Sequence, residues 1–428
     1  MCKTFYYKSY DFDAATGTLS LAYATDTGLT FADRVVFPAP VRPTPGLDRI
    51  FFLTHIALGI SYYKAFLPPE IEVCSGALTR DEAAFFDDMY LKGLGEFAVR
   101  NNVNLQGKIK FPFGTPSVVP DKTPLRGRAL IPVGGGKDSC LTLEIVKELG
   151  IDAEAVSVNT AKPIAECIRI SGLPSRTIAH TIDPALIALN AAGKVYNGHV
   201  PATALLAFIL WGAAAMYDCK WVAMSCEQSA NIGNTRQGGL AVNHQWSKSF
   251  EFERAFHRLT RIITPDFRYF SLLRPLTEAH VAKLFAAKCA RYFPSVVSCN
   301  KAFRRDKAER LDTWCGRCDK CRFVFLILAP FIPKDTLIRM LGANPLGDAA
   351  QTGGYAELLG LAGHKPFECV GDVGECRWAF NRLKSDPLWR TDAVVAALNP
   401  PPAPEPFRLS AEHSIPREFA HALEIFER

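Results

Sequence analysis

The sequence predicts an α/β protein, with a parallel-sheet nucleotide-binding core between an amino-terminal α+β domain and a mostly helical carboxyl-terminal region. Three observations predict this class. A glycine-rich turn at 134–139 lies between a short apolar strand and a segment with helical spacing. Strands and helices alternate after that turn. Residues 1 to about 48 instead alternate apolar and polar positions, which is typical of antiparallel strands.

Composition indicates a globular protein of two or three domains. The 428 residues are 48% hydrophobic and 21% charged, and the longest apolar stretch, 200–217, contains Pro201 and Gly212. We therefore expect no membrane partner, and a start without a signal peptide predicts a cytoplasmic protein. Thirteen cysteines favour thiols and metal ligands over disulfides. A net charge of +6 suits anionic small molecules, and no nucleic-acid partner is expected.

The amino-terminal region predicts a small sheet followed by helices. Phe5–Phe37 is expected to form antiparallel strands, and 50–67 and 79–99 have helical spacing. Thr79 with Glu82 three residues later is a capping box. A proline-rich connector follows at 106–128. These features divide the chain into predicted domains 1–120, 121–335 and 336–428.

The core predicts a parallel sheet covered by helices. The expected strands are 128–133, 153–158, 176–182 and 220–225, and the expected helices are 141–150, 163–171, 184–217, 250–263 and 278–293. Ligands of such sheets bind beyond the carboxyl ends of the strands. The loops after Val133, Val158, Ile182 and Ser225 are therefore expected to share one crevice. The tail holds a proline-rich extended segment at 399–406 and then a last helix.

The glycine-rich turn is typical of a phosphate-binding site. Its residues are Gly134, Gly135, Gly136, Lys137, Asp138 and Ser139. Glycines let the backbone approach an anion, and the free amides of the following helix point at it. Asp138 is a candidate ligand of Mg²⁺, and the Ser139 hydroxyl can donate to an oxygen. Lys137 is either a partner of pyrophosphate or a solvated surface lysine, and the whole turn can also be one without a ligand.

This turn matches neither the Walker nor the Rossmann pattern. It resembles the SGGxDS loop of the PP-loop ATP pyrophosphatases, with Gly134 where that family usually has serine. The resemblance implies a PP-loop (HUP-like) core that binds ATP with Mg²⁺.

Four cysteines predict a metal site. Cys315, Cys318 and Cys321 have C-x₂-C-x₂-C spacing, and Cys299 lies sixteen residues before them. Four thiolates suit a closed structural Zn²⁺ site, although an iron–sulfur cluster is the other four-cysteine possibility. A chance cluster of buried cysteines is the alternative without a metal.

Further motifs extend over most of the chain. They are Tyr7–Gly17, Asn197–Pro201, Glu227–Asn234, Asn243–Glu253 and His364–Gly371. The glycine turn with the cysteines resembles 7-cyano-7-deazaguanine synthase over 130–325. The further motifs together resemble the UDP-N-acetylmuramoyl-L-alanyl-L-glutamate epimerase family instead, and because this resemblance spans nearly the whole chain it is the preferred hypothesis.

The epimerase resemblance implies a substrate and a reaction. The substrate is UDP-MurNAc-L-Ala-L-Glu, whose terminal L-glutamate is converted to D-glutamate with ATP and Mg²⁺ through an acyl-adenylate, releasing AMP and pyrophosphate. A nucleobase-modifying enzyme and a nucleotide sensor without turnover are the alternatives. The sequence does not specify an oligomeric state.

Site residues are expected on three further stretches. Glu227, Ser229, Asn231 and Asn234 follow a strand and are expected to line the nucleotide crevice, unless they form only a polar turn. His199 is a candidate catalyst or a packing residue. His244, Lys248 and Glu251 are candidates for contacts with the substrate, or a solvated face.

Epimerisation needs proton donors on two faces of the α-carbon. Glu368 and Cys369 are the most interesting candidates, with Lys365 lowering the pKa of the thiol, although Cys369 can also be an inert buried cysteine. The predicted catalytic set is therefore Asp138, His199, Lys248, Glu368 and Cys369.

Overall fold

The computed structural model describes residues 2–303, 310–363 and 365–427. It shows an α/β protein with a large, mixed, mostly parallel β-sheet and a helical carboxyl-terminal region. Two compact units share the chain. Unit 1 consists of Met1–Leu130, Arg176–Val222 and Arg236–Phe270, and unit 2 of Ile131–Ser175, Ala223–Thr235 and Ser271–Arg428. His364, part of one motif above, lies outside the described residues.

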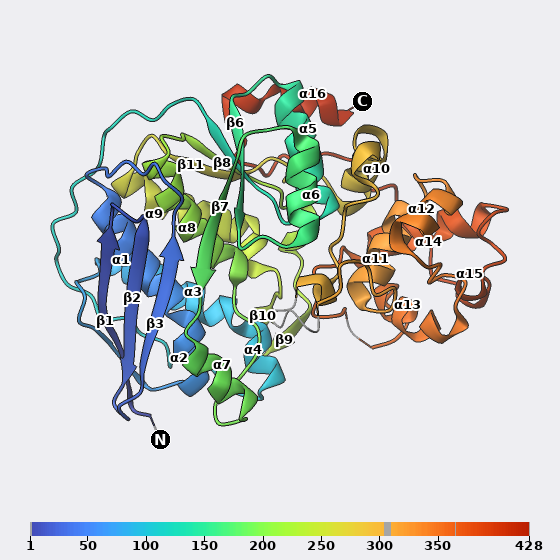
Figure 1. Cartoon of the computed structure of the whole chain (residues 1–428). Coiled ribbons are helices and arrows are strands. Elements are labelled where there is room, and N and C mark those ends of the chain that lie inside the picture. The colour runs from blue at the N-terminus through green and yellow to red at the C-terminus, as the bar shows by residue number, and fades with distance from the viewer. Residues whose placement is uncertain (1, 304–309, 364, 428) are drawn as a thin grey trace. The chain divides into compact units, whose positions relative to one another are not determined.

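Unit 1 contains the antiparallel strands that the sequence predicts. They are β1 (Thr4–Asp13), β2 (Thr18–Thr25) and β3 (Thr30–Val36), and Figure 1 shows them side by side. Two more strands extend this ladder, β4 (Glu70–Val73) beside β1 and β7 (Ser175–Thr181) beside β3. Alternate residues of β3 are buried, as expected for a sheet with one covered face.

The helices of unit 1 begin and end near the predicted limits, with one correction. They are α1 (Leu47–Leu58), α2 (Ile60–Phe66), α3 (Arg80–Gly93), α4 (Gly95–Arg100), α7 (Pro184–Ala191), α8 (Ala202–Met216) and α9 (Phe250–Ile263). The Thr79–Glu82 capping box is confirmed at the start of α3. The single long helix predicted over 184–217 is wrong. Gly193 and Gly198 have positive φ angles and Pro201 precedes α8, so the backbone leaves the helix between α7 and α8.

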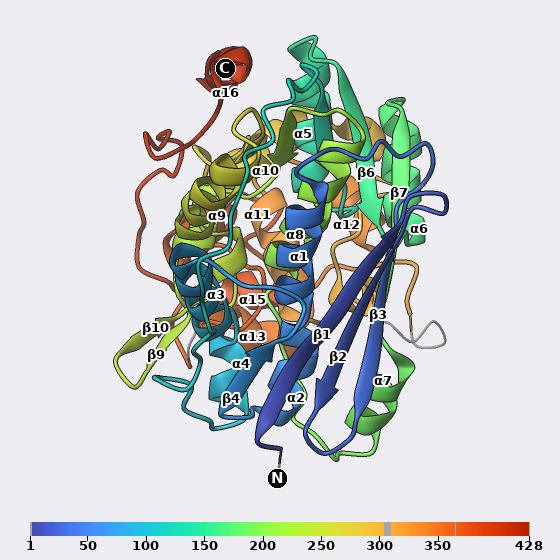
Figure 2. The same cartoon turned by 90° about the vertical axis from the view of Figure 1, so that its left-hand side faces the viewer.

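Aromatic rings fill the interior of unit 1, where α1 packs against β1 (Figure 2). Their hydroxyl groups have partners. The Tyr7 and Tyr90 hydroxyls lie 2.5 Å apart, Tyr90 donates to the Ile56 carbonyl at 2.7 Å, and Tyr23 donates to the His55 carbonyl at 3.0 Å. This core therefore buries large apolar area without leaving these polar groups unsatisfied.

Three further short strands belong to the large sheet. They are β5 (Ala129–Pro132), β8 (Trp221–Met224) and β11 (Arg268–Ser271), of which the sequence predicted the first two. β5 and β8 are parallel, with Ala129 opposite Trp221. Their carboxyl ends continue into the glycine turn and the Glu227 loop. A short β-hairpin, β9 (Thr235–Gln237) with β10 (Leu240–Val242), follows that loop.

Unit 2 contains one further strand, β6 (Ala153–Val158), and the remaining helices. These are α5 (Lys137–Glu148), α6 (Lys162–Ser171), α10 (Glu278–Lys288), α11 (Asp319–Leu328), α12 (Lys334–Leu341), α13 (Thr352–Leu358), α14 (Val373–Ser385), α15 (Ala393–Ala397) and α16 (His421–Glu427). The predicted limits of β6 and α6 are confirmed within one residue. The helix predicted over 278–293 is shorter, since α10 ends at Lys288 and a 3₁₀ turn (Ala290–Tyr292) follows.

The proline-rich tail lies against the start of α10. The Thr277 hydroxyl donates to the Pro406 carbonyl at 2.5 Å, and the Ser410 amide donates to the Pro275 carbonyl at 2.9 Å. In the part of the chain that the structure describes, no helix has the length and hydropathy needed to cross a membrane.

Candidate active site

The glycine turn gives the helix that follows it no side-chain cap. Gly136 is the N-cap residue of α5 and provides no side-chain acceptor for the amides of the first helical turn. A Cβ atom on Gly134 would meet nothing within 4 Å. Open space beside uncapped helix amides is the arrangement that binds phosphate at helix N-termini.

The turn is held from outside by other segments of unit 2. The Gly135 carbonyl accepts a hydrogen bond from the Val297 amide at 3.0 Å. Gly135 has a φ of 78°, and an added Cβ would lie 3.2 Å from the Ile164 nitrogen. A Cβ on Gly136 would lie 3.3 Å from the Ser298 Cβ. Glycine at 135 therefore satisfies both a left-handed backbone and a close approach.

Lys137 is an internal ion-pair partner and not a surface lysine. Its side chain is 2% exposed, and its ammonium group contacts the carboxylates of Asp138 and Glu278. Burial by itself lowers the pKa of Lys137, but the charges of Asp138 and Glu278 outweigh it and raise the pKa, so the lysine is charged. Burial raises the pKa of Glu278 to about 7, against the attraction of Lys137. Lys137 therefore holds the Asp138 carboxylate beside the glycine turn.

Glu227 follows β8 and faces inward. Its side chain is 4% exposed, and among the described residues its Oε1 atom has no hydrogen-bond partner. Its backbone carbonyl accepts from Arg274 Nη1 at 2.8 Å, which fixes the loop. A buried carboxylate oxygen without a partner is costly and points to a ligand.

A second buried carboxyl group lies in the same unit. The Ser229 hydroxyl and the Ala279 amide both donate to Glu375 on α14, the amide at 2.7 Å. Burial raises the pKa of Glu375 to about 8; the charges of Glu278 and Glu227 add to the rise, while the two hydrogen bonds oppose it. Glu375 is therefore largely protonated at neutral pH.

The segment 365–370 joins the Glu227 loop. Asn234 Nδ2 donates to the Pro366 carbonyl at 2.7 Å. The Lys365 ammonium is buried without a hydrogen-bond partner among the described residues, and burial lowers the pKa of Lys365. The negative charges that act on it include those of Asp372 and Glu227. Unit 2 thus has an unsatisfied cation close to an unsatisfied carboxylate.

Glu368 and Cys369 lie on this segment. Asn300 donates to the Glu368 carboxylate, and Lys320 donates to the backbone carbonyl of Cys369. Both side chains are partly exposed. The structure therefore brings the two proton-transfer candidates into the unit that holds the glycine turn.

The four cysteines converge in unit 2. Sulfur–sulfur distances are 3.9 Å for Cys299–Cys318, 3.7 Å for Cys315–Cys321 and 3.4 Å for Cys318–Cys321. A tetrahedral ion with Zn–S bonds of about 2.3 Å places its sulfurs about 3.8 Å apart, so this donor set fits Zn²⁺. Cys299 lies two residues after Val297, so the cluster is next to the segment that holds the glycine turn.

The predicted histidines lie in unit 1. His199 Nδ1 is 3.3 Å from Glu96 Oε2, and His244 Nδ1 contacts the same oxygen. Arg100 Nε donates to Glu96 Oε1 at 2.5 Å. Burial would raise the pKa of Glu96, but the hydrogen bond and charge of His244 outweigh it and lower the pKa. Burial, and then His244, lower the pKa of His199 to about 4.

Lys248 and Glu251 differ in their surroundings. Lys248 closes the 3₁₀ turn Trp246–Lys248, and its charge contributes to the low pKa of His199. Glu251 is exposed and forms an ion pair with Lys92 at 2.6 Å. The structure therefore groups Lys248 with the histidines, while Glu251 faces solvent.

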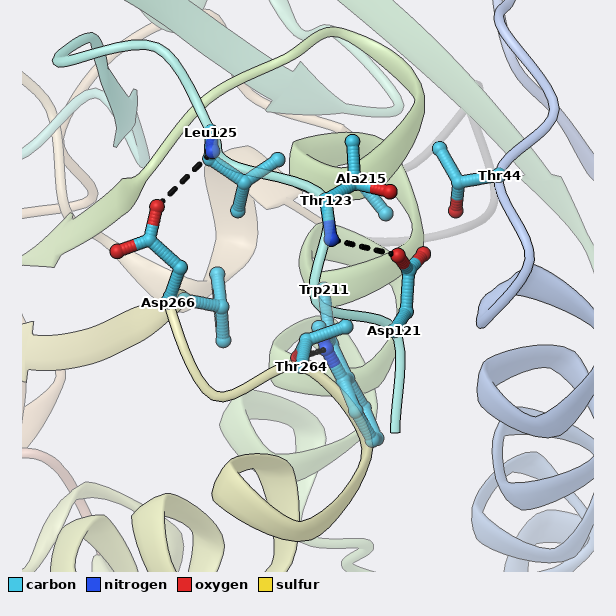
Figure 3. Close-up of a pocket in the computed structure, with 9 residues that line it drawn as sticks. Thr44, Asp121, Thr123, Leu125, Trp211, Ala215, Thr264 and Asp266 are labelled. Atoms are coloured by element: carbon cyan, nitrogen blue, oxygen red, sulfur yellow. Dashed lines mark hydrogen bonds between the residues drawn. The ribbon is translucent and has the colours of Figure 1, made fainter. Parts of the chain in front are cut away.

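Each unit also contains a hollow in its described part. In unit 1 a cavity of about 10 Å³, shown in Figure 3 beside Trp211 and Asp121, has room for about one water molecule. Its walls are fastened by hydrogen bonds such as that from Trp211 Nε1 to Thr264 at 2.8 Å. In unit 2 a groove of about 440 Å³ lies between the tail and the start of α10, and it is large enough for a small ligand. Its lining residues include Gln228, Thr277, Glu405 and Arg408.

Sequence reasoning missed Glu96, Glu278, Glu375 and Lys320. Glu278 and Glu375 lie in the first turns of α10 and α14, where acidic residues are ordinary because they complement the helix dipole. Only their burial distinguishes them, and a single sequence does not display it.

Comparison with known proteins gives two family matches. A model of the MurL N-terminal domain matches residues 1–272, and a model of the MurL C-terminal domain matches residues 295–410. Together they account for most of the chain.

Individual relatives agree with these matches. A UDP-N-acetyl-alpha-D-muramoyl-L-alanyl-L-glutamate epimerase of Xanthomonas oryzae pv. oryzae is 41% identical over 399 residues, which is 92% of this chain and 88% of the relative. An epimerase of the same name from a Micromonospora species is 39% identical, with 98% of this chain and 97% of the relative covered. A third, from Salinispora tropica, is 40% identical over 92% of this chain and 88% of the relative.

Proposed function

Since the chain belongs to the MurL family of UDP-N-acetyl-alpha-D-muramoyl-L-alanyl-L-glutamate epimerases, we propose that it activates the terminal glutamate of its substrate with ATP before inverting it. The enzyme is an epimerase that acts on a UDP-MurNAc-dipeptide, a precursor of peptidoglycan. The proposal concerns how unit 2 performs this reaction. The PP-loop identity of its core stays a prediction.

The chemistry explains why ATP is needed. An α-proton beside an ionised carboxylate is hard to remove, because the carbanion would add charge to a group that is already negative. Attack of the α-carboxylate on the α-phosphorus of ATP forms an acyl-adenylate and expels pyrophosphate. In this mixed anhydride the former carboxylate carries no charge, so an enolate can form. Water then releases AMP and the D-glutamyl product.

The observation that carries this proposal is the glycine turn with its uncapped helix. Gly134 leaves room for phosphate oxygens beside the amides of α5, while Gly135 and Gly136 let the turn pack closely against Ile164 and Ser298. The Ser139 hydroxyl, which donates to the Gly136 carbonyl at 3.1 Å, is proposed to donate to a phosphate oxygen instead when the nucleotide binds. Asp138 and Glu227 supply carboxylate oxygens, which are the ligands that Mg²⁺ prefers. Bound there, Mg²⁺ would neutralise phosphate charge. Asn231 and Asn234 are proposed to complete the nucleotide site.

Lys137 acts in this proposal through Asp138. Its ammonium group forms ion pairs with two carboxylates, so its positive charge is already neutralised in the protein without a bound phosphate. It fixes the rotamer of Asp138 and keeps that carboxylate ionised. The residue is thus a positioning residue for the metal-binding carboxylate.

Lys365 is proposed to bind the substrate. A terminal glutamate has two carboxylates, and activation of the α-carboxylate leaves the γ-carboxylate charged. A charged group that enters a buried site needs a partner of opposite charge. The Lys365 ammonium, buried without a hydrogen-bond partner among the described residues, fits that need.

Proton transfer is assigned to the side chains three and four residues after this lysine. Glu368 and Cys369 are proposed to remove and return the α-proton, one on each face. His199 and Lys248 of unit 1 are proposed as substrate contacts or as a further proton donor. The four-cysteine site is proposed to hold structural Zn²⁺, which would stabilise the segment after Val297.

A reaction in ²H₂O tests the proposal. With ATP, Mg²⁺ and UDP-MurNAc-L-Ala-L-Glu, the product should be D-glutamyl, carry deuterium at the α-carbon and appear with equal amounts of AMP and pyrophosphate. Epimerisation without ATP would overturn the activation step, and ADP with phosphate would overturn the acyl-adenylate. Asp138→Asn should reduce turnover by about 10²–10³-fold, since it weakens the proposed Mg²⁺ ligand that offsets the phosphate charge.

The Lys365→Met variant tests the carboxylate contact separately. It should raise KM for the UDP-MurNAc-dipeptide by at least about tenfold while KM for ATP changes little, because a charged hydrogen bond to the substrate is lost. Lys162→Met is the matched control, since Lys162 is an exposed lysine of unit 2. Equal effects of both variants would remove Lys365 from the site.

A further inference from the structure

Three separate stretches of unit 1 bring metal-ligand side chains together. Glu96 lies in the short helix α4, His199 in the loop before α8, and His244 in the loop before the turn at Trp246. One oxygen of Glu96 and one nitrogen of each histidine all lie within 4.8 Å of one another. The cluster belongs to unit 1 alone, whereas the cysteine cluster belongs to unit 2.

The three side chains meet at one oxygen of Glu96, where His244 forms a direct hydrogen bond that a bound ion would replace. His199 Nδ1 and His244 Nδ1 both face Glu96 Oε2, and the first of these separations is 3.3 Å. Ligand atoms at about 2.0–2.1 Å from a tetrahedral ion are about 3.3–3.4 Å apart. The two imidazole rings have centroids 4.6 Å apart at an interplanar angle of 47°, so they do not stack.

The two oxygens of Glu96 have different partners: Oε2 contacts both histidines, and Oε1 contacts Arg100. Arg100 holds the other oxygen, Oε1, at 2.5 Å, which orients the carboxylate. Partners of this kind fix ligands in metal sites. The Glu96 side chain is 6% exposed and those of His199 and His244 are 20% and 14% exposed, so the donors lie below the surface but within reach of solvent.

We propose that Glu96, His199 and His244 form a transition-metal site in unit 1, independent of the four-cysteine site in unit 2. Two imidazoles and one carboxylate suit Zn²⁺ or a similar borderline ion, whereas Mg²⁺ and Ca²⁺ prefer oxygen ligands alone. Three protein ligands leave a coordination position for water or an anionic oxygen of a ligand. The site differs from a closed structural site in that respect.

A Co²⁺ titration of the full chain tests this site. Thiolate-bound Co²⁺ gives sulfur-to-metal charge-transfer absorption, and Co²⁺ with nitrogen and oxygen ligands does not, so the two sites are counted separately. The chelator-treated protein should bind about two Co²⁺ ions, one of each kind. Glu96→Gln and His244→Ala should each abolish the nitrogen–oxygen component and leave the thiolate component.

Two further variants control the experiment. Cys315→Ser should remove the thiolate component and keep the other, and His257→Ala, a histidine of unit 1 outside the cluster, should keep both. Circular dichroism and the melting temperature of Glu96→Gln and His244→Ala establish that each variant is folded. Wild-type protein with only the thiolate component, or a second component that survives in folded Glu96→Gln and His244→Ala, would overturn the proposal and leave a hydrogen-bonded Glu–His–His cluster.

Discussion

The interior of unit 1 around β1 and the interior of unit 2 around α5 differ in whether their buried polar atoms have hydrogen-bond partners. In unit 1 the buried polar atoms of Tyr7, Tyr23 and Tyr90 all have hydrogen-bond partners. In unit 2 the buried atoms Glu227 Oε1 and Lys365 Nζ have none among the described residues. The first interior consists mainly of aromatic rings, whereas the second buries the lysine and glutamate side chains of Lys137, Glu278 and Glu375.

This difference separates stability from function. A satisfied aromatic core has no reason to exist other than packing. Unsatisfied buried charges lower the stability of the free protein, so they persist where a ligand or a reaction uses them. Unit 2 therefore carries the candidate active site at a cost in folding free energy, and substitutions in the two interiors should differ in what they change.

Lys137→Met is the change with the largest expected effect. It leaves the carboxylates of Asp138 and Glu278 without their cation, so the free energy of unfolding should fall by about 3–5 kcal/mol and turnover should be lost. Urea titration and the epimerase assay measure the two effects. Lys147→Met, on the same helix but partly exposed, should cost no more than about 1 kcal/mol. Similar losses for both lysines would break the comparison.

Tyr90→Phe tests the other interior with a smaller effect. The lost hydroxyl leaves the Tyr7 hydroxyl and the Ile56 carbonyl without a partner, so stability should fall by about 1–3 kcal/mol. Turnover per folded molecule should stay unchanged, because no group of the site is altered. Tyr10→Phe, which removes an exposed hydrogen bond to Asp48, is the control and should cost less. A fall in kcat for Tyr90→Phe would show that the aromatic core does more than stabilise.

Glu375→Gln sharpens the comparison through pH. Burial raises the pKa of Glu375 from 4.5 to about 8, so the folded state keeps a proton that the unfolded chain releases. Its favourable contribution is complete below about pH 4.5 and is lost as the pH rises to about 8, by up to about 1.4 kcal/mol per pH unit. The wild type should therefore lose more stability than Glu375→Gln between about pH 5 and about pH 8, as urea titrations can measure. Parallel curves would contradict the assignment.

Local patterns predicted the parts of the site that lie close together in the sequence. The strand, glycine turn and helix at 128–150 follow from backbone preferences of adjacent residues, and the structure confirms those elements. The spacing of Cys315, Cys318 and Cys321 likewise brings their sulfurs together whatever the fold around them.

Long-range pairs could not be predicted in this way. Lys137 and Glu278 are 141 residues apart, and His244 and Glu96 are 148 apart. Nothing in a local window indicates that Lys137 is buried, since a lysine in the first turn of a helix is usually solvated. The broken helix between α7 and α8 was missed for a related reason, because apolar residues continue through a loop whose glycines have positive φ.

The hydrogen bond from the Val297 amide to the Gly135 carbonyl has a consequence for engineering. The glycine turn, which we propose to bind the nucleotide, is held by a segment that lies more than 150 residues later in the chain, next to the first of the four cysteines. Grafting 128–150 onto another α/β scaffold would transfer the glycines without that segment. The glycine turn is therefore not expected to function outside this fold. A chain truncated before Val297 should keep the 134–139 motif but bind ATP more weakly.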